Sequence, residues 1–161
     1  MNLCYFDTSA IVKRYHTELG TEIVDGLFEL PGVGLITSLW TVLEFIAALS
    51  AKKKRKELSA HALGAAISDF SKEIEDRFTL RELESNYLWS AARLALDHGL
   101  TSADSYHLAT ALDCLNLTSR SDRFAFVCAD DALCRAAAKQ GLFVLNPVTK
   151  DAPKLLDSLS G

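Results

Sequence analysis

Four carboxylates stand where a folded chain could use them together: two directly follow short apolar runs, and two lie inside helical patterns. They are Asp7, Asp130, Glu44 and Asp104. A cluster of acids repels itself strongly unless cations neutralise it. Because hard oxygen ligands favour Mg²⁺ or Mn²⁺ over zinc, such a cluster suits one or two of these ions. Ions of this kind can deprotonate a water and stabilise charge on a phosphodiester oxygen, which is the chemistry of metal-dependent nucleases.

Each acid also has a simpler interpretation. The three aspartates could cap a helix or complement its dipole, because aspartate is common at helix N-termini. Glu44 lies in the apolar stretch TSLWTVLEFIAALSA, where a salt bridge to a core arginine could compensate its charge. The two interpretations of Asp7 are compatible if Thr8 or Ser9 closes the first helix while Asp7 faces a cation.

The elements that must position these acids follow from the alternation of short apolar runs with longer helical patterns. Strands are expected at 3–6, 34–37, 78–80, 124–128 and 143–145, and helices at 10–15, 21–30, 39–54, 60–76, 84–97, 103–115 and 132–139. This order predicts a three-layer α/β/α fold around a central, mostly parallel sheet of about five short strands. Ligands of such sheets bind beyond the carboxyl ends of the strands, so the acids are expected at that rim.

The helix boundaries carry their own signals. Ser59, Ser102 and Asp130 are expected as N-caps, and Gly99 and Gly141 stand where a C-terminal glycine belongs.

The overall composition limits the class of protein. A chain of 161 residues with 49% hydrophobic and 24% charged residues is typical of one globular domain, with a core at about 1–147 and a tail at 148–161. Neither a membrane-spanning run nor a signal peptide is recognisable, so we expect a cytoplasmic protein with no membrane partner. The four cysteines lack metal-binding spacing and are expected to be reduced, structural thiols.

Nucleic acid would have to be contacted locally, because a net charge of −4 gives no global positive field. The candidate cations for such contacts are Lys52 and Arg55 in KKKRK, Lys13 and Arg14, and Arg120 and Arg123. KKKRK has an equally simple alternative as a solvated helix end that complements the helix dipole.

His107 lies three residues after Asp104 on the same helical face and could be taken for a general base. A metal-activated water needs no histidine, so we interpret His107 as a histidine that is hydrogen-bonded within the helix layer.

With these motifs in place, the sequence resembles the PIN domain family and, within it, the VapC-type toxin ribonucleases of toxin–antitoxin pairs. The resemblance rests on four blocks in this order: FDTSAIVKRY, TSLWTVLEFIAAL, LTSADSYHLATAL and FVCADDALCRAAAKQGLFVLNP. It implies a parallel sheet with helices on both sides, in which the first and fourth strands are adjacent at the centre. It also implies a pocket that binds Mg²⁺ or Mn²⁺ and hydrolyses RNA to leave a 5′-phosphate and a 3′-hydroxyl.

The resemblance assigns roles to individual residues. It makes Asp7, Glu44, Asp104 and Asp130 the catalytic acids and metal ligands, with Asp7 and Asp104 as the principal ones. It implies that Ser9, or else Thr8, bonds a ligand carboxylate or a metal-bound water.

The last block departs from the family pattern at Cys128, which replaces a threonine. Since a thiol is a weak hydrogen-bond donor, support of Asp130 is expected to be weaker here. Asp131 could compete with Asp130 for the pocket, but the Asp-x-x-Leu spacing to Leu133 favours Asp130.

The partners implied by the resemblance are an RNA substrate, a second copy of the chain and a cognate antitoxin whose C-terminal segment crosses the active-site groove. An apolar groove between the helix at 21–30 and the helix of Leu43 and Ile46 could receive that segment. Two other functions stay open: a non-catalytic PIN-like module that binds RNA or protein, and an aspartyl-phosphate phosphatase-like protein with Asp7 as nucleophile. In the latter case Ser9 stands where a second aspartate is expected.

Overall fold

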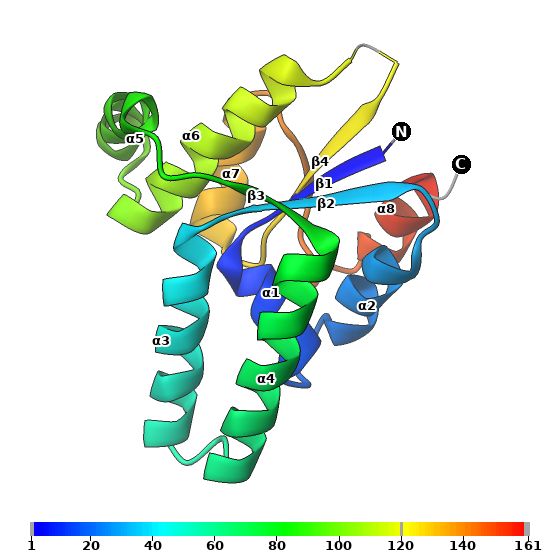
Figure 1. Ribbon diagram of the computed structural model, residues 1–161. Coiled ribbons are helices and arrows are strands. Elements are labelled where there is room, and N and C mark those ends of the chain that lie inside the picture. The colour runs from blue at the N-terminus through cyan, green and yellow to red at the C-terminus, as the bar shows by residue number, and fades with distance from the viewer. Residues whose placement is uncertain (1, 120, 160–161) are drawn as a thin grey trace.

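The computed structural model describes residues 2–119 and 121–159 and shows a five-stranded sheet between two layers of helices (Figure 1). The strand order is β3-β2-β1-β4-β5, and each neighbouring pair is parallel. The strands are β1 (Asn2–Phe6), β2 (Val33–Ser38), β3 (Phe78–Arg81), β4 (Arg123–Val127) and β5 (Phe143–Leu145). The predicted fold class is therefore confirmed, and so is the central position of the adjacent first and fourth strands.

The helices form the two outer layers. They are α1 (Thr8–Tyr15), α2 (Thr21–Glu29), α3 (Trp40–Lys54), α4 (Ala60–Arg77), α5 (Ser85–His98), α6 (Ser102–Leu117), α7 (Asp131–Lys139) and α8 (Ala152–Leu159). Buried residues of α5, α6 and α7 pack on one face of the sheet, and those of α1, α2, α3, α4 and α8 pack on the other. Along β1, Tyr5 faces the first group while Cys4 and Phe6 face the second, as the alternation of side chains in a strand requires.

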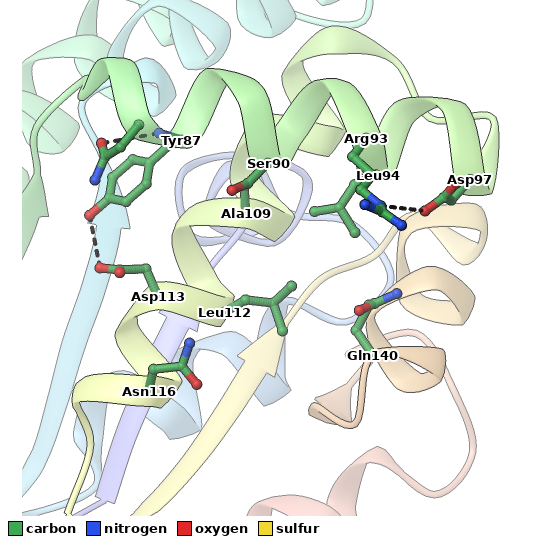
Figure 2. A pocket seen from close by; sticks show the side chains of 11 residues that line it. Tyr87, Ser90, Arg93, Leu94, Asp97, Ala109, Leu112, Asp113, Asn116 and Gln140 are labelled. Carbon is green, nitrogen blue, oxygen red and sulfur yellow. Dashed lines mark hydrogen bonds and ion pairs between the residues drawn. The ribbon is translucent and has the colours of Figure 1, made fainter.

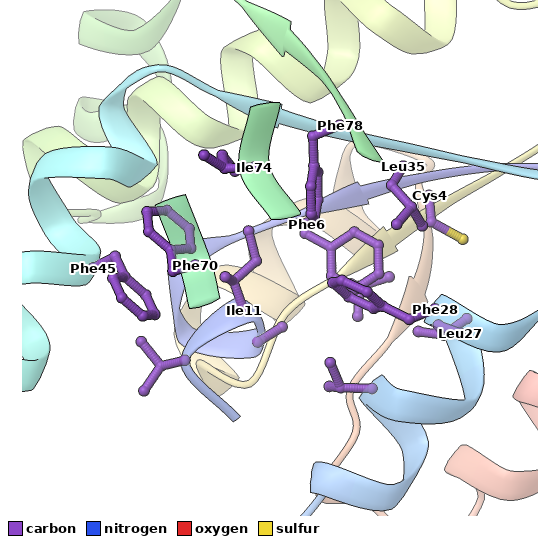
Figure 3. Packing of buried hydrophobic residues seen from close by; sticks show 14 of the residues in the cluster. Cys4, Phe6, Ile11, Leu27, Phe28, Leu35, Phe45, Phe70, Ile74 and Phe78 are labelled. Atoms are coloured by element: carbon purple, nitrogen blue, oxygen red, sulfur yellow. The ribbon is translucent and has the colours of Figure 1, made fainter. Parts of the chain in front are cut away.

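Aromatic side chains fill the core beside β1 (Figure 3). Phe6, Phe28 and Phe78 meet edge to face, with ring centroids 5.5–5.8 Å apart. Phe45 of α3 stacks on Phe70 of α4 at 3.9 Å. Truncating a buried phenylalanine typically costs about 3–5 kcal/mol, so these contacts fix α3, which carries Glu44, against α4.

The helix boundaries follow the predicted capping residues with one exception. The side chains of Ser59 and Asp130 cap α4 and α7, and Gly99 and Gly141 adopt positive φ angles of 66° and 85° after α5 and α7. The predicted cap Ser102 is wrong: it is already the first residue of α6, and Thr101 accepts the capping hydrogen bond from the backbone of Asp104.

The C-terminal segment, expected as a tail from 148, contains α8. Ala152 and Leu159 of this helix are buried in the core beside α2. Gly26 of α2 permits the approach, since a Cβ atom built there would lie 2.7 Å from Leu156.

The four cysteines are free thiols, in agreement with the prediction of structural cysteines. Burial raises the pKa of Cys4 to about 12 and that of Cys114 to about 11, so both are poor nucleophiles. No helix within 2–119 or 121–159 combines the length and apolar character that a membrane span needs.

Candidate active site

A pocket of about 240 Å³ at the carboxyl edge of β1 and β4 brings the four predicted acids together. Its lining residues are Asp7, Thr8, Ser9, Val12, Glu44, Ala48, Asp104 and Asp130. They come from α1 and its N-cap, from α3 and α6, and from the connection between β4 and α7. The pocket therefore lies beyond the strand ends, where parallel sheets place their ligands.

Asp7 links the central strand to the first helix. Its backbone N–H donates to the carbonyl of Val127 on β4 at 2.9 Å, and its side chain is almost fully buried. Oδ2 accepts hydrogen bonds from the backbone N–H of Ser9, at 2.9 Å, and from the Ser9 hydroxyl. Asp7 itself thus caps α1, which confirms the simpler interpretation of this residue. The alternative in which Thr8 or Ser9 closes the helix is wrong, because the aspartate carboxylate is the group that accepts from the free N–H.

Glu44 is held by two donors on one oxygen. Its Oε2 accepts from the Thr8 hydroxyl at 2.7 Å and from Nε2 of His107 at 2.7 Å. Burial acts to raise the pKa of Glu44, but the contacts with His107 and Thr8 outweigh it and lower the pKa. Glu44 is therefore kept as a carboxylate, and its partner is a histidine and not the core arginine of the simpler interpretation.

His107 lies on α6 and is completely buried. Its Nδ1 is 2.9 Å from the hydroxyl of Tyr5, and its Nε2 is 3.9 Å from Oδ1 of Asp7. Burial acts to lower the pKa of His107, but the contact with Glu44 and the charge of Asp7 raise it overall. The prediction of a hydrogen-bonded histidine is confirmed, whereas its place beside the acids was not foreseen.

Asp104 shows that the acids share one electrostatic environment. Burial raises the pKa of Asp104, and the charges of the other three acids raise it further. The hydrogen bond that Thr101 donates at 2.7 Å acts in the opposite direction but does not outweigh them. Asp130 is more exposed, and its Oδ1 accepts from the backbone N–H of Leu133 at 2.8 Å at the start of α7.

Asp130 and Asp131 have separate environments. Asp130 lines the pocket, whereas Oδ1 of Asp131 accepts a hydrogen bond from the amide of Asn146 at 3.1 Å. The Asp-x-x-Leu spacing to Leu133, which favoured Asp130 as the pocket residue, agrees with this placement.

Cys128 lies behind the acids at the end of β4. Its Sγ accepts from the backbone N–H of Asp130 at 3.3 Å and lies 3.7 Å from Oδ2 of Asp7. The contact with Cys134 and burial both raise the pKa of Cys128. The thiol therefore supports the backbone of Asp130, while Ser9, which also accepts from the N–H of Ala129 at 2.9 Å, supports the carboxylate of Asp7.

The pocket fits a hard divalent cation by the chemistry of its donors, since four carboxylates point to Mg²⁺ or Mn²⁺. Its side chains are not assembled for one, because no three His, Cys, Asp or Glu residues of the described chain stand close enough to hold a metal ion. Each acid accepts a hydrogen bond from a neighbouring group in this arrangement.

None of the predicted basic residues that the structure describes lines the pocket. Arg14 pairs with Asp25 and Glu73, and Arg123 begins β4 at the opposite edge of the sheet. Lys13 and Lys52 both pair with Glu18, at 2.9 and 2.7 Å. Arg55 is exposed and pairs with Glu57, and Arg120 lies outside the described residues. Lys13 and Lys52 therefore share one carboxylate within the protein.

Two further pockets lie around α5 and α6. One of about 370 Å³ is polar and includes Ser90, Arg93 and Asn116 (Figure 2). The other, of about 250 Å³, is apolar and is lined by residues that include Trp40, Leu88 and Tyr106.

The groove expected beside α2 is not formed. Val24, Leu27 and Phe28 of α2 are buried in the core, because α2 packs against α1 and α8. The prediction that these residues would receive an antitoxin segment is therefore wrong.

Comparison with known proteins agrees with this geometry. A family model of the PIN domain matches residues 4–139. Ribonuclease VapC45 and Ribonuclease VapC49, both of Mycobacterium tuberculosis, are each 35% identical to the chain over 115 residues, which is 70% of this chain and 76% of the relative.

Three solved structures share the fold, each at 20% sequence identity. PAE2754 from Pyrobaculum aerophilum has a TM-score of 0.61 and covers 98% of this chain and 88% of its own. FitAcB from Neisseria gonorrhoeae has a TM-score of 0.61, and the match covers 89% of this chain and 97% of FitAcB. FitAB bound to the IR36 DNA fragment has a TM-score of 0.62, and the match covers 91% of this chain and 96% of the other. Since the family model covers most of the sheet and the curated relatives match over two thirds of their length, the chain belongs to the PIN domain family and, within it, to the VapC-type proteins.

Proposed function

We propose that this protein is an endoribonuclease toxin that uses Mg²⁺ or Mn²⁺ to hydrolyse RNA phosphodiester bonds. The observation that supports this most directly is the lining of a single pocket by Asp7, Glu44, Asp104 and Asp130. The names of the curated relatives, both ribonucleases, point to the same reaction. The hydroxyls of Thr8 and Ser9 in this pocket donate to Glu44 and Asp7, so the carboxylate cluster suits attack by water rather than by a side chain of the protein.

The proposed mechanism assigns one task to each acid. A bound divalent cation supplies an activated water and stabilises charge on the phosphate. Asp7 and Asp104 are the proposed principal ligands, and Glu44 and Asp130 complete the pocket directly or through water. Ser9 holds the carboxylate of Asp7, so it orients a ligand without touching the substrate. Thr8 does the same for Glu44.

RNA is proposed to run from the acidic pocket toward the basic end of α3. Lys52 lies eight residues after Glu44 on the same helical face, which places the two about 12 Å apart along the helix axis. Lys13, Arg55 and Arg120 are the other proposed phosphate contacts. Because Glu18 pairs with both lysines, an RNA phosphate would have to displace it.

A second copy of the chain is the proposed partner for the exposed apolar face formed by α3 and α5. Leu43 is 64% exposed and Trp89 is 83% exposed, beside the apolar pocket at Leu88. Exposed apolar patches of this kind commonly mark interfaces. If this face forms the homodimer, the double substitution Leu43→Ser and Trp89→Ser gives a monomer in light scattering, whereas an unchanged mass contradicts the assignment.

The other proposed partner is a cognate antitoxin, and the proposed compartment is the cytoplasm. The structural neighbour FitAB is bound to a DNA fragment, which supports a search for a partner that binds DNA. A small DNA-binding protein encoded beside this gene, co-purifying with the chain and stopping RNA cleavage, is the expected result.

Neighbouring aspartates provide a matched test of the activity. Asp104→Asn and Asp130→Asn are expected to lower the rate of RNA cleavage in Mg²⁺ or Mn²⁺ by orders of magnitude, and EDTA is expected to abolish it. Asp131→Asn, which changes an acid outside the pocket, should cleave like the wild type. Equal cleavage by all three variants would exclude the pocket as the active site, and RNA binding without cleavage by the wild type would favour the non-catalytic module.

A further inference from the structure

We propose that His107 is a positioning residue that, together with Thr8, fixes one oxygen of Glu44 and leaves the other for the pocket. The proposal rests on the proposed function, because it concerns how Glu44 is presented to a divalent cation. It assigns a specific task to a buried residue that the proposed mechanism does not otherwise use.

The hydrogen bonds of Glu44 are one-sided. The Thr8 hydroxyl and Nε2 of His107 both reach Oε2 at 2.7 Å. Among the described residues, none forms a hydrogen bond with Oε1. A free glutamate on a helix surface samples many rotamers, and fixing such a side chain costs up to about 2 kcal/mol of conformational entropy. Two donors on Oε2 meet that cost before a cation arrives, and they leave Oε1 unengaged on a residue that lines the pocket.

The imidazole is fixed in turn from the other side of its ring. The hydroxyl of Tyr5 lies 2.9 Å from Nδ1. Because the carboxylate of Glu44 can only accept, Nε2 of His107 is the donor to it, and in the neutral ring Nδ1 is then the acceptor for the Tyr5 hydroxyl. Tyr5 is fully buried in the central strand and stacks on Phe126 with ring centroids 5.8 Å apart. The chain Tyr5–His107–Glu44 therefore connects the centre of the sheet to a side chain on α3.

A role as general base does not fit this geometry. Both ring nitrogens are engaged, and His107 has no exposed surface through which to reach a water in the pocket. His107 acts through Glu44 and not on the substrate. Residues that orient metal-binding carboxylates typically change metal affinity or activity by about 10–100-fold when they are replaced.

The matched variants are His107→Gln and His107→Asn. A glutamine amide can reach the position of Nε2 and donate to Glu44, whereas the shorter asparagine amide reaches only the position of Nδ1 beside Tyr5. Both replace the ring by a neutral amide, so they differ chiefly in the contact with Glu44. Tyr5→Phe is a third variant, which keeps the aromatic stack and removes only the hydroxyl that orients the ring.

The primary measurement is Mn²⁺ binding by electron paramagnetic resonance titration of the full chain without RNA. We expect His107→Asn to weaken binding by about 10–100-fold, His107→Gln to stay within a few-fold of the wild type and Tyr5→Phe to fall between them. In steady-state RNA cleavage, kcat should fall in the same order while KM for RNA stays constant. Thermal unfolding of each variant in EDTA shows whether it is folded.

The outcomes separate this role from the proposed function. If the wild type binds Mn²⁺ and cleaves RNA but the glutamine and asparagine variants are equally affected, the positioning role is overturned and the proposed function stands. The positioning role is also overturned if only the unfolding temperature changes, since that is what a merely structural histidine predicts. If His107→Asn does not fold, wild-type affinity in Tyr5→Phe overturns the role. A wild type that neither binds Mn²⁺ nor cleaves RNA overturns both.

Discussion

Asp7 combines two tasks that a pair of substitutions can separate. Its carboxylate caps α1 through the backbone N–H of Ser9, and it also lines the acidic pocket. Asp7→Asn keeps a side-chain oxygen for the cap and removes the charge, whereas Asp7→Ala removes both. Asparagine and aspartate are about equally good N-caps, so the first substitution isolates the charge.

The expected magnitudes follow from these contacts. Both substitutions remove repulsion from the other acids to the same extent, so the difference between them in EDTA measures the hydrogen bonds that the side-chain oxygen accepts from Ser9, the cap among them. Loss of an aspartate or asparagine cap to alanine costs about 1 kcal/mol. For a chain of 161 residues this corresponds to a Tm about 2–4 °C lower for the alanine variant. A cation at ten times its Kd stabilises the wild type by about 1.4 kcal/mol, and both variants should lose most of that gain.

The assay is calorimetric unfolding of the three proteins in EDTA and in Mg²⁺, with RNA cleavage measured on the same preparations. We expect the asparagine variant to match or exceed the wild type in EDTA and to have lost cleavage by orders of magnitude. Equal Tm values for the two variants in EDTA would refute the capping role. Wild-type cleavage by Asp7→Asn would refute its role as a ligand.

Three further predictions concern other parts of the molecule. Glu18→Gln frees Lys13 and Lys52, so the slope of log RNA affinity against log salt should steepen by about 0.7 for each lysine that then meets a phosphate. Burial raises the pKa of Asp104 above its usual 3.8, and the three neighbouring acids raise it further. Ionising Asp104 is therefore harder in the folded protein than in the unfolded chain, so this group lowers the free energy of unfolding as the pH rises above 3.8. In urea unfolding with EDTA, Asp104→Asn should therefore lose less stability than the wild type between about pH 4 and pH 7, and parallel curves would contradict this. Leu159→Ala, at a buried position of α8, should lower the free energy of unfolding by about 2–5 kcal/mol, and a change below 0.5 kcal/mol would show that α8 does not belong to the core.

The sequence alone was sufficient to predict those helices and strands that have a local sequence signal. The apolar runs of the five strands stand out because both faces of a parallel sheet are covered, and the expected boundaries agree with the structure to within two residues. Helix α8 was missed because APKLLDSL is short and contains proline, and its stability comes from packing Ala152 and Leu159 against the rest of the core.

The site could be predicted as a set of acids but not as a network. The strand-end rule is local enough to place Asp7 and Asp130 at one rim from sequence order alone. The contact between Glu44 and His107 joins residues 63 positions apart, and the pairing of Glu18 with Lys52 joins residues 34 apart. The periodicity of apolar residues in the sequence does not predict such contacts, because they depend on the side-chain rotamers that packing selects. For the same reason the two lysines were expected to be available for RNA, whereas the fold pairs them with a glutamate.

The four acids differ in how the fold compensates their charge. This difference explains why Glu44 is the acid that contacts His107. Asp7 and Asp130 cap α1 and α7, and Asp104 lies in the first turn of α6. Each of these three carboxylates therefore lies at the positive end of a helix dipole, which favours its charge. For Asp104, burial and the other acids outweigh this effect and raise the pKa. Glu44 lies in the interior of α3, where no free N–H groups are available. It is also the acid that His107 contacts at 2.7 Å. Three of the acids thus lie at helix N-termini, where Asp7 and Asp130 are caps, and the fourth is held by His107 and Thr8. The proposed role of the aspartates as metal ligands is compatible with these positions, because capping engages only some of the carboxylate oxygens.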